Sequence, residues 1–207
     1  MQSLYDGQNI YFDYSEIRPE GARLMTMGGR ASGPQPLIKL HDFIRETMHN
    51  AQGRQLTSLE CHDICNQIAE IVVVGGVRRS SQISLSDLHD KDMRHAKEWP
   101  YPIKRAMANN SAIYREKPSA AEFLKEWASL ALSGTGERGI FNLEAAQNKA
   151  PPRRYAPLIQ GTNPCGEIML RDMQFCNLSE VVVRADDDLD TLLDKVETAT
   201  WLGVIQS

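Results

Sequence analysis

The spacing of apolar residues predicts four helices along the chain. The first begins after Pro36, where Leu37, Leu40, Ile44 and Met48 lie three or four residues apart and therefore share one helical face. Similar spacing recurs in three later stretches. The four helices are expected at residues 37–52, 57–69, 119–133 and 189–201.

Two of these helices begin at residues that are suited to cap them. Thr57 has Glu60 three positions further on, which is the pattern of a capping box, and Ser119 is expected to cap the third helix. The large apolar side chains of that third helix are expected to face the core; they are Phe123, Trp127 and Leu130.

Runs of β-branched residues predict the strands. Residues 71–74 read Ile-Val-Val-Val, which is typical of a strand buried on both faces in a parallel sheet. Residues 86–118 are polar and contain prolines, so short helices and loops are expected there. Strands that alternate with helices predict an α/β fold. Further extended segments are expected at residues 83–85, 139–143, 168–170 and 181–183.

Composition and charge exclude several classes of protein. The chain has 207 residues, 42% of them hydrophobic, and a formal net charge of -4, so neither nucleic acid nor an anionic membrane is an expected partner. No apolar run approaches the roughly 18 residues that a membrane helix needs. The N-terminus does not resemble a secretory signal, and four cysteines do not make a disulfide scaffold. The expected location is a reducing cytoplasm.

Three chemically useful side chains stand at alternate positions near the C-terminal end. In the segment 161–167 these are Asn163, Cys165 and Glu167. An extended backbone would place them on one face, with neighbours roughly 6.6 Å apart, whereas Pro164 and Gly166 favour a tight loop that brings their tips together. The carboxylate can take a proton from a hydroxyl, and the amide can hold a hydroxyl in place.

The role of the thiols stays open from the residues alone. A thiol can act as nucleophile, metal ligand or hydrogen-atom donor, and Cys176 could be a second, redox-active thiol. The alternative is two buried cysteines on adjacent strands. Cys61 and Cys65 lie four residues apart beside His62, but a metal site needs about two more ligands. No metal site is therefore predicted, and both are expected to be buried core cysteines.

Several segments, in the same order along the chain, resemble ribonucleotide reductase large chains. Asn-Pro-Cys-Gly-Glu-Ile at 163–168 and Cys-Asn-Leu-Ser-Glu at 176–180 are similar to the finger-loop and redox-cysteine segments of that family. Residues 28–34, 61–64, 71–80 and 107–112 are similar to the class II members, which use adenosylcobalamin. Among these, the ribonucleoside-triphosphate reductases are the most similar.

The resemblance implies a fold and a mechanism. Residues 1–207 would form part of the ten-stranded α/β barrel, its N-terminal half plus an inner finger loop. Cys165 would become a thiyl radical and abstract the 3′ hydrogen of the ribose. Glu167 would act as base on the 3′ hydroxyl, and Asn163 would hold the ribose hydroxyls. Cys176 would supply reducing equivalents and end as a disulfide. Adenosylcobalamin would be the cofactor.

The resemblance also implies partners. The substrate would be a ribonucleoside triphosphate or diphosphate, the effector a deoxynucleoside triphosphate, and the reductant a thioredoxin-type protein. In the family, the loop after residue 74 links the effector site to the substrate base. Glycines and arginines suit a phosphate, so this loop is expected near a nucleotide; its residues are Gly75, Gly76, Arg78 and Arg79.

Two departures from the family keep alternatives open. The cysteine that pairs with Cys176 would lie upstream of residue 1, and the C-terminal cysteine pair has no counterpart. Both ends look cut, so the chain alone is expected to be inactive. One alternative is a class I large chain, which takes its radical from a separate metal-bearing small subunit. Another is a non-catalytic piece that works only with a complementary reductase polypeptide.

Overall fold

The computed structural model describes residues 1–25, 28–74, 78–79 and 81–206. These residues form two compact units, Met1–Ala156 and Pro157–Ser207. Both units contain helices and strands, in agreement with the α/β prediction.

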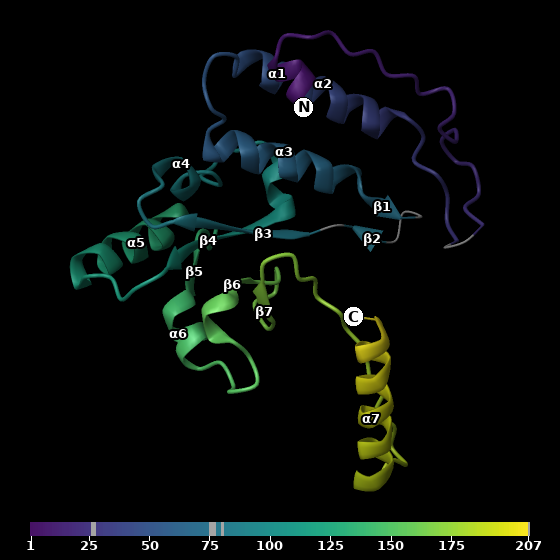
Figure 1. Cartoon of the computed structure of the whole chain (residues 1–207), viewed down its shortest axis with the longest axis vertical. Helices are drawn as coiled ribbons and strands as arrows, with labels where there is room; N and C mark the ends of the chain where they lie inside the picture. The colour runs from purple at the N-terminus through teal and green to yellow at the C-terminus, as the bar shows by residue number, and fades with distance from the viewer. Residues whose placement is uncertain (26–27, 75–77, 80, 207) are drawn as a thin grey trace. The chain divides into compact units, whose positions relative to one another are not determined.

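Three helices form the N-terminal part of the first unit, with α2 lying alongside α3 (Figure 1). Leu4, Met48 and Ile64 pack together as the core between them. The segment that follows α3 is a short antiparallel pair of strands. The elements are α1 (Gln2–Tyr5), α2 (Gln35–Asn50), α3 (Ser58–Ile71), β1 (Val73–Val74) and β2 (Arg78–Arg79).

The capping box predicted at the start of α3 is present. The Thr57 side chain accepts a hydrogen bond from the Glu60 N–H, and the Glu60 carboxylate accepts one from the Thr57 N–H. Arg54 also donates to both carboxylate oxygens, at 2.6 and 2.8 Å. These hydrogen bonds, that of Arg54 above all, lower the pKa of Glu60 to about 2.

This lowered pKa predicts an acid-sensitive helix end. Because the folded pKa of Glu60 lies below its ordinary value of 4.5, its stabilising contribution is complete above pH 4.5 and is lost as the pH falls towards about 2. Amide hydrogen exchange should therefore show the first turn of α3 fraying over that range. The Glu60→Gln variant should show the fraying already at neutral pH and no further change on acidification. Protection factors in the first turn of α3 that stay constant between pH 4.5 and about 2 in the native chain would contradict the prediction.

The rest of the first unit is built on a three-stranded parallel sheet in the order β3-β4-β5. Strand β4 is central, and α5 forms the crossover to β5 (Figure 1). Gly134, in the left-handed conformation at φ 67°, ends α5. The elements are β3 (Gln82–Asp87), α4 (Lys91–Arg94), η1 (Ile103–Met107), β4 (Ala108–Tyr114), α5 (Ala120–Ser133), β5 (Gly139–Asn142) and α6 (Leu143–Asn148).

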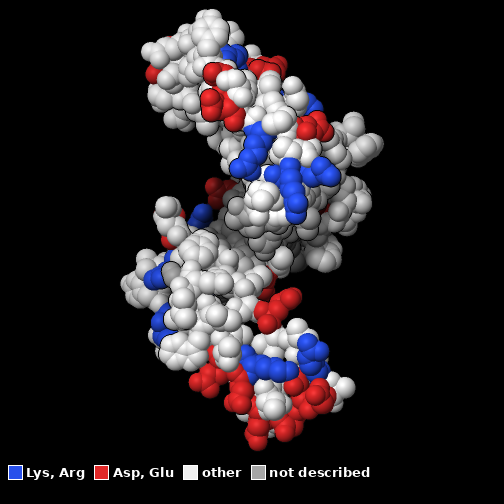
Figure 2. Space-filling model, turned by 90° about the vertical axis from the view of Figure 1, so that its right-hand side faces the viewer, with Lys and Arg blue, Asp and Glu red and all other residues white. Residues whose placement is uncertain are grey.

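The second unit contains an antiparallel hairpin and a long helix. Strands β6 and β7 pair with each other, and a segment without helix or strand leads from β7 to α7. Acidic side chains gather at the N-terminal end of α7 (Figure 2), where they suit the helix dipole. The elements are η2 (Ala156–Leu158), β6 (Ile159–Thr162), β7 (Met169–Arg171) and α7 (Leu189–Gln206).

Three predictions about the strands are wrong. Ile71 is the last residue of α3, and only Val73 and Val74 are extended, in an antiparallel pair rather than a parallel sheet. Residues 108–114, part of the stretch for which short helices and loops are expected, form the central strand β4. Residues 181–183 belong to neither a helix nor a strand.

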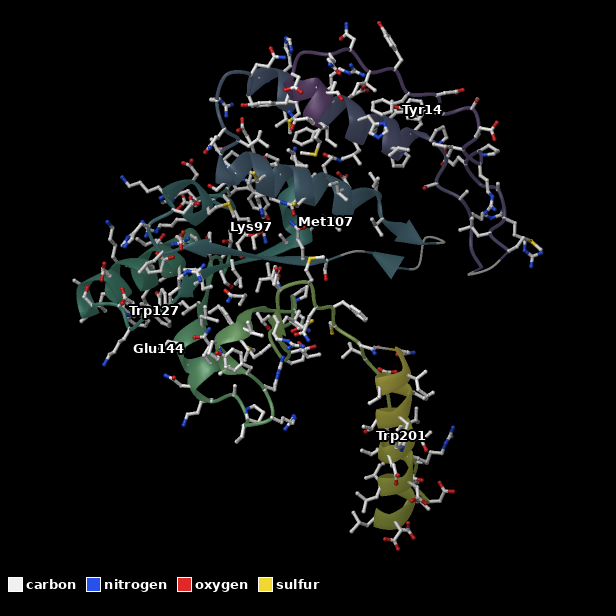
Figure 3. The ribbon with its side chains drawn as sticks, in the orientation of Figure 1. Tyr14, Lys97, Met107, Trp127, Glu144 and Trp201 are labelled. Carbon is white, nitrogen blue, oxygen red and sulfur yellow. The ribbon has the colours of Figure 1, made fainter. Side chains whose placement is uncertain are left out.

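The predicted core of α5 is also wrong. Phe123 is 38% exposed and Trp127, seen on α5 in Figure 3, is 54% exposed, whereas Glu126 is 1% exposed. The Glu126 carboxylate accepts hydrogen bonds from Arg138 Nε at 2.6 Å and Arg94 Nε at 2.9 Å, so its charge is compensated where it is buried.

Cys61 and Cys65 are exposed, contrary to the expectation that they lie in the core. The face of α3 that turns inward carries His62, Ile64, Asn66 and Ala69 instead. His62 is 4% exposed, and its Nδ1 lies 2.7 Å from the hydroxyl of Ser84 on β3. Helix α3 therefore meets the sheet through polar contacts, which the apolar spacing of its sequence does not indicate.

Candidate active site

The candidate site lies on the loop of the β6–β7 hairpin. Thr162, at the end of β6, pairs with Met169 at the start of β7. The Asn163 N–H donates to the Ile168 carbonyl at 3.1 Å, which closes the base of the loop. The Gly166 N–H donates to the Asn163 carbonyl at 3.0 Å, so residues 163–166 form a tight turn with Pro164 and Cys165 at its centre.

Asn163 is the central side chain of this loop. It is 4% exposed, and its Oδ1 accepts a hydrogen bond from the Ile168 N–H at 3.0 Å. Its Nδ2 donates to Glu167 Oε1 at 2.6 Å and lies 3.7 Å from the sulfur of Cys176. The amide therefore contacts both the carboxylate and the second thiol. The tight-loop alternative predicts that the tips of Asn163, Cys165 and Glu167 come together, and within the described part of the chain only the Asn163 and Glu167 side chains do so.

The thiol of Cys165 stands at the exposed tip of the same turn. The backbone bonds of the turn hold Cys165, because Gly166 bonds to Asn163 on either side of it. Among the contacts of the described residues, the side chains brought together are Asn163, Glu167 and Cys176, while Cys165 joins them through the backbone alone. The expectation of buried cysteines on adjacent strands does not fit, since Cys165 is exposed and Cys176 half-buried.

Cys176 lies on the segment that leads from β7 to α7. Next to it, the Asn177 side chain donates to the Gly203 carbonyl in α7 at 2.7 Å. This bond anchors the segment that carries Cys176 on the helix. All four cysteines of the chain are free thiols.

The predicted nucleotide loop is not tested by the described residues. Gly75 and Gly76 lie outside them, and Arg78 and Arg79 are described only as the backbone of β2. Their placement near a nucleotide stays a prediction.

Two further residues of the site escaped the sequence prediction. The Thr162 hydroxyl donates to the Ile168 carbonyl at 3.0 Å and lies 3.3 Å from Asn163 Oδ1. Asn177 anchors the segment that carries Cys176. The sequence offered one hint for each residue: Thr162 stands directly before Asn163, and Asn177 stands directly after Cys176. Adjacency does not reveal where a side chain points.

Neither a metal-binding cluster nor a membrane-spanning helix occurs in the described residues 1–25, 28–74, 78–79 and 81–206. Within these ranges no three His, Cys, Asp or Glu side chains are grouped to hold a metal ion. Over the same part of the chain, no helix combines the length and apolar character needed to cross a membrane.

The left-handed backbone conformation of Gly166 predicts that any residue with a side chain would be strained at this position. Its φ is +87°, a conformation that other residues rarely adopt, and no atom lies within 4 Å of the place where a Cβ would stand. Backbone strain alone should therefore make Gly166→Ala destabilise the second unit by about 1 kcal/mol. The measurement is urea unfolding followed by the fluorescence of Trp201 in α7. Gly203→Ala, a helical position with ordinary contacts, is the matched control and should be neutral or stabilising.

The sequence that forms the sheet and the loop matches a known protein family. The family model described as ribonucleotide reductase, barrel domain, matches residues 76–202. The chain therefore belongs to the ribonucleotide reductase barrel-domain family.

The relatives narrow this similarity to one type of reductase. The chain is 37% identical over 186 residues to the adenosylcobalamin-dependent ribonucleoside-triphosphate reductase of Lactobacillus delbrueckii subsp. bulgaricus, covering 84% of this chain and 24% of the relative. It is 37% identical over 180 residues to the enzyme of that name from Lacticaseibacillus paracasei, covering 83% of this chain and 23% of that relative.

A solved structure is similar as well. The crystal structure of a B12-dependent, class II ribonucleotide reductase matches with a TM-score of 0.66 and 34% identity, covering 79% of this chain and 23% of that one. The chain thus spans about a quarter of the length of the curated relatives it matches.

Proposed function

We propose that this chain is a catalytic segment of a class II ribonucleotide reductase, which reduces ribonucleotides to deoxyribonucleotides for DNA synthesis. The observation that carries the proposal is the loop on which one amide holds a carboxylate and a second thiol beside an exposed cysteine. These are the groups that the family motif requires at positions 163, 165, 167 and 176. As part of the proposal, residues 1–207 are the N-terminal half of the barrel plus its finger loop.

In this proposal Cys165, Glu167 and Asn163 each have a separate role in the reaction. Cys165, as a thiyl radical, takes the hydrogen atom from C3′ of the ribose. Glu167 accepts the proton of the 3′ hydroxyl, which helps the 2′ hydroxyl leave as water. A proton acceptor must reach roughly 2.6–3.2 Å from its target. Asn163 binds one oxygen of Glu167 at 2.6 Å, which restricts the carboxylate to one orientation beside the sugar.

Two electrons are needed to complete the reduction. Cys176 supplies them together with a second cysteine that this chain does not carry, and the two end as a disulfide. A thioredoxin-type reductant would restore the thiols. Because the site depends on free thiols, and all four cysteines are free, a reducing compartment such as the cytoplasm fits the proposal.

The loop fits a cofactor that acts on Cys165 from outside the protein interior. The thiol is exposed, and the space around Gly166 is open where a Cβ would stand. The tip residues Cys165 and Gly166 would therefore lie against the cofactor. Adenosylcobalamin, when bound, supplies the radical chemistry that converts the thiol into a thiyl radical. The chain itself orients the thiol and keeps Glu167 and Asn163 in register with it.

The relatives favour class II over class I. Those named above are adenosylcobalamin-dependent ribonucleoside-triphosphate reductases, so a ribonucleoside triphosphate is the proposed substrate. A deoxynucleoside triphosphate is the proposed effector, near Arg78 and Arg79. In a class I enzyme a separate small subunit would supply the radical instead.

The experiment uses the completed reductase, in which these 207 residues are joined to the remaining three quarters of a class II chain. Adenosylcobalamin and a dithiol are added without any small subunit, and deoxynucleotide is measured. Formation that depends on the cofactor supports the proposal. Formation that requires a small subunit, or no formation in either case, contradicts it.

A second candidate is a piece that acts only with a complementary polypeptide. Exposed apolar side chains on α7 favour it; in Figure 3 Trp201 projects from this helix. The exposed set is Leu189, Leu193, Val196, Trp201, Leu202, Val204 and Ile205. Large exposed apolar patches mark surfaces that bind another protein segment. Mixing the purified chain with a polypeptide that carries the remainder of a class II reductase tests this directly. Activity of the 207-residue chain alone would refute it.

A further inference from the structure

The hydroxyl of Thr162 lies next to the side-chain amide of Asn163. Thr162 is the last residue of β6 and is 7% exposed, so it is shielded from the solvent that would contact a ligand at the tip of the loop. Its Oγ1 donates to the Ile168 carbonyl at 3.0 Å and lies 3.3 Å from Asn163 Oδ1. The Ile168 carbonyl also accepts the Asn163 N–H at 3.1 Å.

These contacts determine which way the Asn163 amide points. The Ile168 N–H donates to its Oδ1 at 3.0 Å, and the Thr162 hydroxyl holds Ile168 by donating its single hydrogen to the Ile168 carbonyl at 3.0 Å. A flipped amide would set Nδ2 against the Ile168 N–H, donor against donor. It would also set Oδ1 against Glu167 Oε1, acceptor against a negatively charged acceptor. Buried polar groups left in such pairs are costly.

The orientation of the amide decides what the carboxylate can do. Asn163 Nδ2 donates a hydrogen bond to Glu167 Oε1 at 2.6 Å. Among the described residues, no side chain forms a hydrogen bond with Glu167 Oε2. Oε2 is therefore the oxygen that can take a proton from a substrate hydroxyl. The same Nδ2 lies 3.7 Å from Cys176 Sγ, so one amide sets the position of the base and of the reducing thiol.

We propose that Thr162 is a positioning residue for the reduction. Its hydroxyl holds Ile168, and the Ile168 N–H in turn holds the Asn163 amide so that Nδ2 faces Glu167 and Cys176. It acts through Asn163 and does not touch the substrate. This inference rests on the proposed function for the catalytic roles, whereas the hydrogen bonds that support it belong to the hairpin itself.

The first test measures the orientation of the amide in the 207-residue chain, without any reaction. The side-chain N–H signals of Asn163 are compared by NMR with and without the Glu167→Gln substitution, which replaces the charged acceptor of Asn163 Nδ2. In the native chain and in Thr162→Ser, this substitution should shift those signals. In Thr162→Val, which has similar volume but no hydroxyl, the shift caused by Glu167→Gln should be lost. A shift that persists in Thr162→Val overturns the proposal.

The second test measures turnover in the completed reductase. Thr162→Val should lower kcat about 10- to 100-fold, the scale expected when a catalytic group is misplaced by about 1 Å. KM should stay within about 2-fold, because the substrate contacts themselves are retained. Thr162→Ser should restore most of kcat. Thr198→Val, at a threonine whose hydroxyl bonds only within α7, is the control and should leave kcat unchanged.

The outcomes separate the possible failures. Full kcat in Thr162→Val, or an equal loss in Thr162→Val and Thr162→Ser, overturns the positioning role. Loss of the folded hairpin in both Thr162→Val and Thr162→Ala, seen by NMR, also overturns it, because the hydroxyl is then needed for the fold. Failure of the proposed function looks different, since the completed reductase with the native Thr162 would then form no deoxynucleotide, or would form it only with a small subunit.

Discussion

Cys165→Ser should abolish deoxynucleotide formation by the completed reductase. A serine O–H bond is much stronger than a thiol S–H bond, so the variant cannot form the radical that takes hydrogen from C3′. Removing the residue that carries the chemical step lowers turnover by about 10⁴-fold or more. The turn itself should be unchanged, because its bonds run between the main chains of Asn163 and Gly166.

Cys61→Ser is the matched control for this prediction. Cys61 is another exposed, free cysteine, and it lies on α3 in the first unit. The control should keep near-native kcat and KM. The measurement is radiolabelled deoxynucleotide formed per enzyme under cofactor saturation. If Cys165→Ser keeps more than a few per cent of the native rate, Cys165 is not the hydrogen-abstracting residue.

Glu126→Ala should cause the largest loss of stability. Glu126 accepts hydrogen bonds from Arg94 and Arg138, and both arginines are largely buried. Removing one partner of a buried ion pair leaves uncompensated charge and costs about 3–5 kcal/mol. Arg138 also donates to the Ser86 hydroxyl and to the carbonyls of Asp87 and Leu88, so the loss should spread to the end of β3.

The pH dependence of this network has a definite sign. Burial by itself raises the pKa of Glu126, but the hydrogen bonds and charges of Arg138 and Arg94 together lower it below 4.5. Its stabilising contribution is thus present above about pH 4.5 and is lost as the pH falls through the folded pKa. Urea unfolding at several pH values measures this.

Two variants control the stability prediction. Glu116→Ala replaces an exposed glutamate and should change the free energy of unfolding by no more than about 0.5 kcal/mol. Glu126→Gln keeps the shape and should lose less than Glu126→Ala, with no acid dependence from this site. Equal stability of Glu126→Ala and the native chain would show that the network contributes nothing.

Local sequence signals were sufficient where local interactions decide the structure. The periodic apolar residues of α2 and the capping box at Thr57 and Glu60 predicted two helices close to their observed bounds. The capping residue Ser119 did the same for the start of α5. In each case the interaction that ends the helix joins residues only a few positions apart.

Burial set by distant partners could not be predicted in this way. Strand β4 carries Asn109, Asn110 and Ser111, which look like a loop, yet it lies between β3 and β5. Glu126 looks solvent-exposed in sequence, but Arg94 and Arg138 compensate its charge from 32 and 12 positions away. The buried face of α5 is therefore the one whose Glu126 pairs with the two arginines, and not the one that carries Phe123 and Trp127.

The candidate site was predicted in its residues but not in its contacts. The motif identified Asn163, Cys165, Glu167 and Cys176, and the turn residues Pro164 and Gly166 indicated a tight loop. The motif could not indicate which group of the Asn163 amide faces Glu167. That choice depends on Ile168 and Thr162, whose roles emerge only when the hairpin is folded.

The central claim is that Cys165 removes the hydrogen atom from C3′ of the ribose. The most direct measurement is single-turnover reduction, by the completed reductase, of ribonucleotides that carry deuterium at C3′ or at C1′. The account predicts slower reduction with deuterium at C3′ and an unchanged rate with deuterium at C1′. Equal rates for both labels, together with activity that survives Cys165→Ser, would contradict it.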